Sequence, residues 1–118
     1  MEAKRFGNGC VASPHYLASS AGLAVMASGG NALDAAIATN LVLGVVAPYM
    51  CGYGGDIFAL IWAPPQRSGG ANAGELYAYN GSGRSGSKAT LEAAREAIGS
   101  DQMPQIGPHS VTVPGAAE

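Results

Sequence analysis

The feature that most constrains this chain is a long stretch with almost no charge. Between Gly7 and Gln66 only two side chains carry a formal charge, Asp34 and Asp56. Charged residues make up 12% of all 118 positions, against ~25% in ordinary soluble domains. A chain this short leaves much of its area facing solvent, and so few charges would cover that surface poorly. We therefore expect the stretch to be buried on more than one side, either in an alanine- and glycine-rich domain or in a piece of a larger protein.

The balance of charges argues against nucleic-acid binding. The formal net charge is −2, from six basic and eight acidic residues, and the sequence has no basic stripe that would neutralise phosphates. A membrane span is not expected either, because the longest apolar run, residues 35–50, is interrupted by Asn40 and Pro48 and is shorter than the ~20 residues that a spanning helix needs. Residues 1–7 are not followed by the apolar segment of a signal peptide. This predicts a cytoplasmic protein, or a periplasmic or secreted one if a leader is missing.

The cysteines and histidines do not form a recognisable chemical site. Cys10 and Cys51 have no metal-ligand neighbour at a useful spacing, so we expect buried free thiols and neither a metal nor a cofactor. His15 and His109 each follow a proline and are far apart in the sequence. No Ser/His/Asp order stands out, and His15, in the first turn of an expected helix, is interpreted as structural.

Two helices are expected in the first half of the chain. Ser13 and Pro14 are typical of a helix start, with the serine as N-cap and the proline at the first helical position. Apolar residues then recur at helical spacing as far as the glycine pair at 29–30, which ends the helix. A second helix follows, with Asn31 as its cap and Asp34 in a capping-box position. Its apolar residues surround it up to Pro48, which predicts burial on most sides.

The second half predicts a hairpin, a helix and a short strand. Residues 57–62 read as a buried strand and residues 75–79 as its antiparallel partner. A glycine- and serine-rich stretch follows at 80–87, and then a helix over 91–98 with Thr90 as its cap and Gly99 as its stop. Residues 110–113 read as a further strand.

Two features are candidates for ligand binding. The turn over residues 52–56 could cradle an anion with its N–H groups, but it lacks the Lys and Ser/Thr of a phosphate loop and leads into a strand, which favours a tight helix-to-strand turn. Arg84 stands among glycines and serines, with Lys88 four residues on. A guanidinium there could bind a carboxylate through two hydrogen bonds, or it could be a solvated loop arginine.

Several blocks together resemble the opening of γ-glutamyltranspeptidases. They are the Val-Ala-Ser-Pro-His-Tyr-Leu-Ala block at 11–18, the Gly-Gly-Asn-Ala-Leu-Asp-Ala-Ala-Ile-Ala block at 29–38, the Gly-Tyr-Gly-Gly-Asp block at 52–56 followed by Phe58, and Val-Thr-Val-Pro-Gly at 111–115. Their order and spacing match along nearly the whole chain. The block at 29–38 is the specific one, whereas the glycine turn alone would not be.

The resemblance implies an α+β fold, here part of the four-layer αββα sandwich of the N-terminal-nucleophile hydrolases. Members cleave themselves from a precursor into two subunits, and the new N-terminal threonine of the small subunit attacks a γ-glutamyl amide. Residues 1–118 then form the N-terminal segment of the large subunit, an incomplete domain. Its partners are the rest of that subunit, the small subunit and a small γ-glutamyl substrate. In the family the nucleophilic threonine is followed two positions later by a histidine. Thr39, Thr90 and Thr112 are not followed by a histidine at that position. We therefore expect no catalytic residue here and no activity of this chain alone.

The resemblance also assigns a role to Arg84. Family members carry an arginine shortly after the second strand that binds the α-carboxylate of the glutamyl group, and Arg84 stands in that place. The usual Glu-Ala-Pro after this arginine is replaced by Ser-Gly-Ser at 85–87, which favours the acylase-like branch as an alternative. A cephalosporin or glutaryl acylase-like amidase and a non-catalytic α/β binding module therefore remain open beside the γ-glutamyl enzyme.

Overall fold

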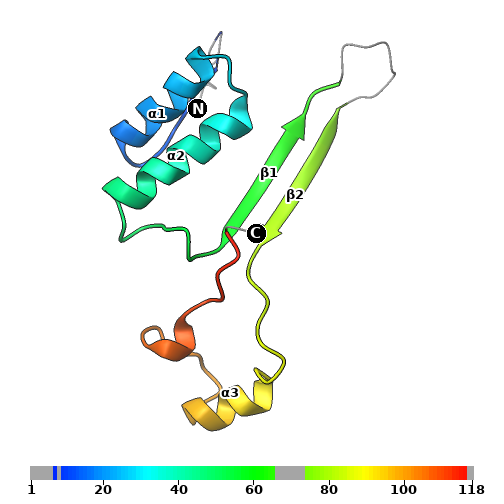
Figure 1. The fold of residues 1–118 in the computed structure, drawn as a ribbon. Coiled ribbons are helices and arrows are strands. Elements are labelled where there is room, and N and C mark those ends of the chain that lie inside the picture. Colours follow the sequence, from blue (N-terminus) through cyan, green and yellow to red (C-terminus); the bar gives the residue numbers. More distant parts are fainter. Residues whose placement is uncertain (1–6, 8, 66–73, 117–118) are drawn as a thin grey trace, which may run out of the picture. The chain divides into compact units, whose positions relative to one another are not determined.

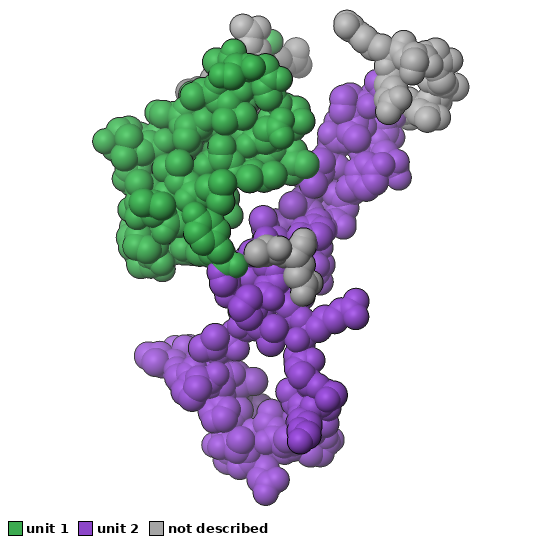
Figure 2. Space-filling view, in the orientation of Figure 1, with its two compact units in different colours: residues 1–53 green, residues 54–118 purple. Residues whose placement is uncertain are grey.

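The computed structural model describes residue 7 and residues 9–65 and 74–116 (Figure 1). The chain divides between Tyr53 and Gly54 into two compact units, coloured separately in Figure 2. The first unit holds two helices, and the second holds a hairpin, a short helix and a 3-10 turn.

Helix α1 spans Tyr16–Ala27 and begins two residues later than the sequence predicts. The N-cap is His15, whose Nδ1 accepts a hydrogen bond from the backbone N–H of Leu17 at 3.3 Å, so the prediction of Ser13 as cap is wrong. The Ser13 hydroxyl instead donates to the His15 carbonyl at 2.9 Å. His15 takes the capping role because it directly precedes Tyr16, the first residue of the helix. The predicted stop is confirmed, with Gly29 at a φ of +95° just beyond the helix.

Helix α2 spans Ala32–Val46 and begins with the predicted capping box. The Asn31 side-chain oxygen accepts from the N–H groups of Leu33 and Asp34, at 2.8 and 3.1 Å, and the Asp34 carboxylate accepts from the N–H of Asn31 at 2.9 Å. Three N–H groups around the helix start are thus satisfied by side chains. The acidic side chain also lies in the first turn, where the helix dipole favours it.

The contact between α1 and α2 is made by small residues. Ala18 and Gly22 on α1 and Ala35 and Thr39 on α2 are buried. A Cβ atom on Gly22 would lie 2.3 Å from the Thr39 hydroxyl oxygen, so the two backbones approach closely. The Thr39 hydroxyl donates to the Ala35 carbonyl at 2.7 Å, which satisfies this buried polar group within its own helix.

The far side of α2 is apolar and exposed. Leu33, Ile37, Leu41 and Val45 follow one another at intervals of four residues and are each 44–73% exposed. Residues at this spacing share one face of a helix. The prediction that α2 is buried on most sides is therefore wrong within the described part of the chain, where small residues bury one face only.

The second unit is built on an antiparallel hairpin, as predicted. Strand β1 spans Ile57–Ala63 and β2 spans Glu75–Gly81, with Ile57 opposite Gly81 and Ala63 opposite Glu75. The side chains of β1 alternate between half-buried and exposed positions, and its exposed residues are Phe58, Leu60 and Trp62. The prediction of a buried strand is thus wrong for one face of β1 among these residues, because the sheet described here has two strands and the side chains on that face are exposed.

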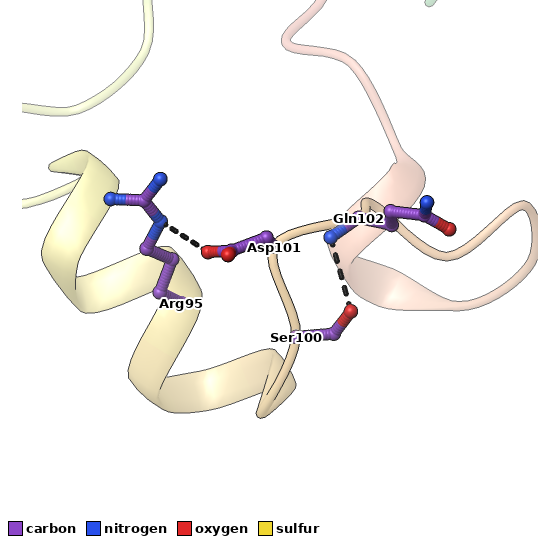
Figure 3. A network of polar contacts seen from close by, with 4 residues as sticks. All are labelled: Arg95, Ser100, Asp101 and Gln102. Atoms are coloured by element: carbon purple, nitrogen blue, oxygen red, sulfur yellow. Dashed lines mark hydrogen bonds and ion pairs between the residues drawn. The ribbon is translucent and has the colours of Figure 1, made fainter.

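Helix α3 spans Leu91–Ile98 and matches its predicted bounds. The Thr90 hydroxyl oxygen accepts from the Ala93 N–H at 3.2 Å, and Gly99 ends the helix in the left-handed conformation. Arg95, in the last turn of the helix, pairs with Asp101 just after it, at 2.7 Å between Nε and Oδ1 (Figure 3). The ion pair is exposed and adds little stability.

The strand predicted at 110–113 is absent from the described residues. A 3-10 turn, η1, spans Pro108–Ser110, and the N–H and hydroxyl of Ser110 both donate to the Gly107 carbonyl. Proline at the first position of the turn fixes the backbone angle that such a turn needs. Val111 and Val113 follow outside any sheet ladder and are exposed. The correct local signal was thus the Gly-Pro pair at 107–108 rather than the two valines.

Candidate functional site

Three separate stretches of backbone meet within the second unit, where β1 begins and β2 ends (Figure 1). The carbonyl oxygen of Gly55 accepts hydrogen bonds from the N–H groups of Gly115 and Ala116, at 3.2 and 3.0 Å. Gly81, the last residue of β2, lies against Gly115 on the other side. We call Gly55, Gly81, Gly83 and Gly115, with the carbonyls that they contact, the glycine clamp.

No side chain fits at two positions of the glycine clamp. A Cβ atom on Gly83 would lie 2.3 Å from the Val113 carbonyl oxygen and 2.6 Å from that of Pro114. A Cβ atom on Gly115 would lie 2.4 Å from both the Gly81 carbonyl oxygen and the Gly83 nitrogen. Every one of these neighbours is backbone, so none of them can rotate away as the end of a side chain could. Glycine is required here by close approach.

Arg84 leaves the glycine clamp directly after Gly83. Its side chain is exposed, and within the described ranges it has neither a hydrogen bond nor an ion pair. Lys88, four residues on, is exposed as well. All N–H donors of the guanidinium are thus available for a ligand. Arg84 is the first residue of the segment 84–112, whose two ends are held together by the glycine clamp. Its binding role stays a prediction.

Asp56 contributes a buried carboxylate oxygen beside the glycine clamp. This residue follows Gly55 and precedes β1, and its Oδ1 is shielded from solvent with no hydrogen-bond partner among the described residues. A buried acceptor without a donor is unfavourable. A negative group at this point also disfavours an anion in the turn over 52–56, so the structure agrees with the interpretation of that segment as a connecting turn. The sequence signal was available, since Asp56 is one of the two charges in the neutral stretch.

Two threonines and one histidine have structural roles among the described residues. Thr39 bonds within α2 and Thr90 caps α3, so both hydroxyls are engaged. His15 caps α1 and stacks on Tyr16, with ring centroids 5.0 Å apart, which confirms its structural interpretation. His109 lies in η1.

The thiols differ from expectation, because Cys10 is exposed and Cys51 is half-buried, although both are free. The described ranges hold no group of three His, Cys, Asp or Glu side chains that could bind a metal.

An open pocket of about 370 Å³ lies in the first unit. It is bordered by the segment before α1 and by one side of α2, including Cys10, Ser13, Thr39 and Asn40. Its remaining lining is mostly apolar, and no charged side chain contributes to it. The pocket offers little chemistry of its own, so Arg84 and the glycine clamp remain the stronger candidate site.

Comparison with known proteins places this chain in a family. A family model described as Gamma-glutamyltranspeptidase matches residues 18–118. The Glutathione hydrolase-like YwrD proenzyme of Bacillus subtilis is 42% identical over 109 residues, which cover 92% of this chain and 19% of that protein. The Oxamate amidohydrolase proenzyme of Klebsiella pneumoniae subsp. pneumoniae is 40% identical over the same shares of each chain.

A solved structure agrees with these relatives. The crystal structure of Helicobacter pylori gamma-glutamyltranspeptidase matches with a TM-score of 0.72 at 33% identity, over 98% of this chain and 31% of that one. The fold is thus the α+β architecture of an N-terminal-nucleophile hydrolase, as the sequence predicts. The chain belongs to the γ-glutamyltranspeptidase family. It spans about a fifth of the length of the first two relatives.

Among the described residues, α1, α2 and α3 all fall short of the length and apolar character of a bilayer-crossing helix.

Proposed function

We propose that the protein containing this chain hydrolyses or transfers γ-glutamyl amides, and that Arg84 binds the α-carboxylate of the glutamyl group. The observation that carries the proposal is an exposed guanidinium, free of partners among the described residues, shortly after β2 in a chain of this family. A guanidinium forms two parallel hydrogen bonds with a carboxylate, which fixes the orientation of a substrate as well as its affinity. The opposite end of the substrate, the amide, would then face the nucleophile.

The nucleophile is supplied from outside residues 1–118. Two of the threonines here use their hydroxyls within helices α2 and α3, and Thr112 lacks the family's histidine two residues on. This chain therefore acts as the N-terminal segment of a large subunit, together with the rest of that subunit and a small subunit, and is inactive alone. Two relatives are named proenzymes, which supports a precursor that must be processed. The cytoplasmic location stays a prediction from the sequence.

A second candidate substrate class follows from one relative. The Klebsiella protein is named for oxamate hydrolysis, and oxamate is a small amide that carries a carboxylate next to the amide carbon. An arginine that binds a carboxylate suits both oxamate and a γ-glutamyl group, so Arg84 serves either substrate. The acylase-like amidase and the non-catalytic module are not favoured, because the relatives described above are named for glutathione and oxamate hydrolysis.

The experiment compares substrates and variants of the complete protein. We expect hydrolysis of a γ-glutamyl anilide by the wild type, and a fall in kcat/KM of about 10- to 100-fold in Arg84→Ala, the loss of one charge-assisted interaction. Lys88→Ala is the matched control, because this exposed cation lies four residues on in the same segment and should leave kcat/KM within about twofold.

Three outcomes would count against parts of the proposal. An unchanged KM in Arg84→Ala would contradict the assigned role of the guanidinium. Hydrolysis of oxamate without hydrolysis of the γ-glutamyl anilide would favour the second substrate class. Detectable activity of the isolated 118-residue chain would contradict its inactivity.

A further inference from the structure

The two ends of the segment from Arg84 to Thr112 are held together by backbone contacts alone. Its first neighbour, Gly83, touches the carbonyls of Val113 and Pro114, and Gly115 is hydrogen-bonded to Gly55 across the same point. Both ends of the segment are therefore held where the hairpin begins and ends. No side chain of the segment takes part in these contacts.

This geometry fixes the position of the Arg84 backbone but not the position of its guanidinium. The residue before it has its backbone against two carbonyl oxygens, so the Arg84 Cα can shift only if the glycine clamp opens. The guanidinium itself has no partner among the residues that the structure places. The position of the backbone is thus the main restraint that this chain puts on the arginine.

We propose that Gly83 and Gly115 are positioning residues for Arg84, an inference that rests on the proposed function of Arg84 as carboxylate ligand. They act through the backbone, by allowing an approach that any side chain would block. To relieve a contact of 2.3 Å, the backbone at Gly83 and the Val113 carbonyl must part by about 1 Å, because ordinary contact distances begin near 3.4 Å. A displacement of that size at a substrate-binding group can lower the rate by about 100-fold.

The test measures recognition of the carboxylate rather than activity alone. The two substrates are a γ-glutamyl anilide and the 4-aminobutanoyl anilide, which differs only by lacking the α-carboxylate. The readout is the ratio of their kcat/KM values in the complete protein. We expect Gly83→Ala and Gly115→Ala to raise KM for the γ-glutamyl anilide at least tenfold and to lower this ratio as far as Arg84→Ala does. Rates with the second substrate should change much less.

Gly86→Ala is the matched control. It lies three residues beyond Gly83 in the same glycine- and serine-rich stretch, and a Cβ atom there meets nothing within 4 Å. This variant should keep the wild-type ratio. In a protein that already carries Arg84→Ala, adding Gly83→Ala should leave the ratio unchanged, because the residue to be positioned is gone.

A second variant covers the case in which the alanine proteins do not fold. One glycine inserted between Gly83 and Arg84 adds no side chain to the glycine clamp, but moves the arginine along the chain by up to ~3.5 Å. It should lower the ratio as much as Arg84→Ala. If Arg84→Ala lowers the ratio while the insertion or Gly83→Ala leaves it unchanged, the positioning role is wrong. If Arg84→Ala itself has no effect, the proposed function of Arg84 fails instead.

Discussion

The tight contact between α1 and α2 predicts that alanine destabilises the protein at Gly22 but stabilises it at Gly44. In Gly22→Ala the new methyl group would lie 2.3 Å from the Thr39 hydroxyl oxygen and 3.0 Å from the Ala35 carbonyl oxygen. In Gly44→Ala the nearest atoms belong to Tyr53 at 3.8 Å or beyond, which is ordinary contact. Both glycines lie inside helices, so the backbone effect of alanine is the same in both variants.

The magnitude follows from three effects. Alanine in place of glycine inside a helix stabilises by about 1 kcal/mol. At position 22 the overlap costs about 1–3 kcal/mol, and rotating Thr39 to relieve it leaves a buried hydroxyl without its acceptor, at a further cost of about 1–3 kcal/mol. We therefore expect Gly22→Ala to lower the free energy of unfolding by about 1–5 kcal/mol, and Gly44→Ala to raise it by about 0.5–1 kcal/mol.

The assay is urea-induced unfolding of the complete protein, followed by far-UV circular dichroism, with both single variants measured beside the wild type. Thr39→Ala combined with Gly22→Ala should recover part of the loss, since it removes the nearest of the three clashing atoms. The recovery should be incomplete, because Val11 and the Ala35 carbonyl also lie 3.0 Å from the new methyl group. Equal or greater stability of Gly22→Ala than of the wild type would refute the close packing of α1 against α2.

Two smaller predictions concern a helix cap and a tyrosine. Asn31→Ala removes the side chain that accepts from two N–H groups at the start of α2 and should cost about 1 kcal/mol by urea unfolding; Asn31→Gly should cost only a few tenths, and an equal loss in both would contradict the capping role. The Tyr77 hydroxyl donates to the Glu75 carboxylate at 2.6 Å, and this hydrogen bond, together with the negative charge, raises the pKa of the phenol. The stability linked to this pair is present below the ordinary pKa of tyrosine and is lost as pH rises through the raised one. Glu75→Gln should lower the pKa of Tyr77, measured from phenolate absorbance, and an unchanged pKa would refute the contact.

Local signals in the sequence were reliable where the chain satisfies its own backbone. Asn31 with Asp34, and Thr90 with Gly99, mark helix ends through bonds that span four residues or fewer, so neighbours in sequence suffice to predict them. The predicted start of α1 is two residues too early, because the Ser-Pro pair at 13–14 is a strong start signal and a histidine is not a usual cap, whereas the helix begins at Tyr16 with His15 as its N-cap.

Non-local features were harder to predict. The two valines at 111 and 113 have strand propensity, but a strand also needs a neighbouring strand to pair with. Within the described residues the segment at 110–113 pairs with no strand, and the sequence alone does not reveal this. The glycine clamp was missed for the same reason, because Gly55, Gly83 and Gly115 are far apart in sequence and their need to lack a side chain appears only when they meet. Arg84 stands out in the sequence by its isolation among small residues and by the family resemblance, and its binding role stays a prediction.

The exposed row on α2 carries geometric information about what can cover it. Leu33, Ile37, Leu41 and Val45 are spaced by four residues, and rows of that spacing run at an angle of about 26° to the helix axis. A helix whose own four-residue rows interdigitate with this ridge crosses α2 at about 50°. The packing of such a layer would be oblique, like that of globin helices, and would lack the nearly parallel alignment of a coiled coil.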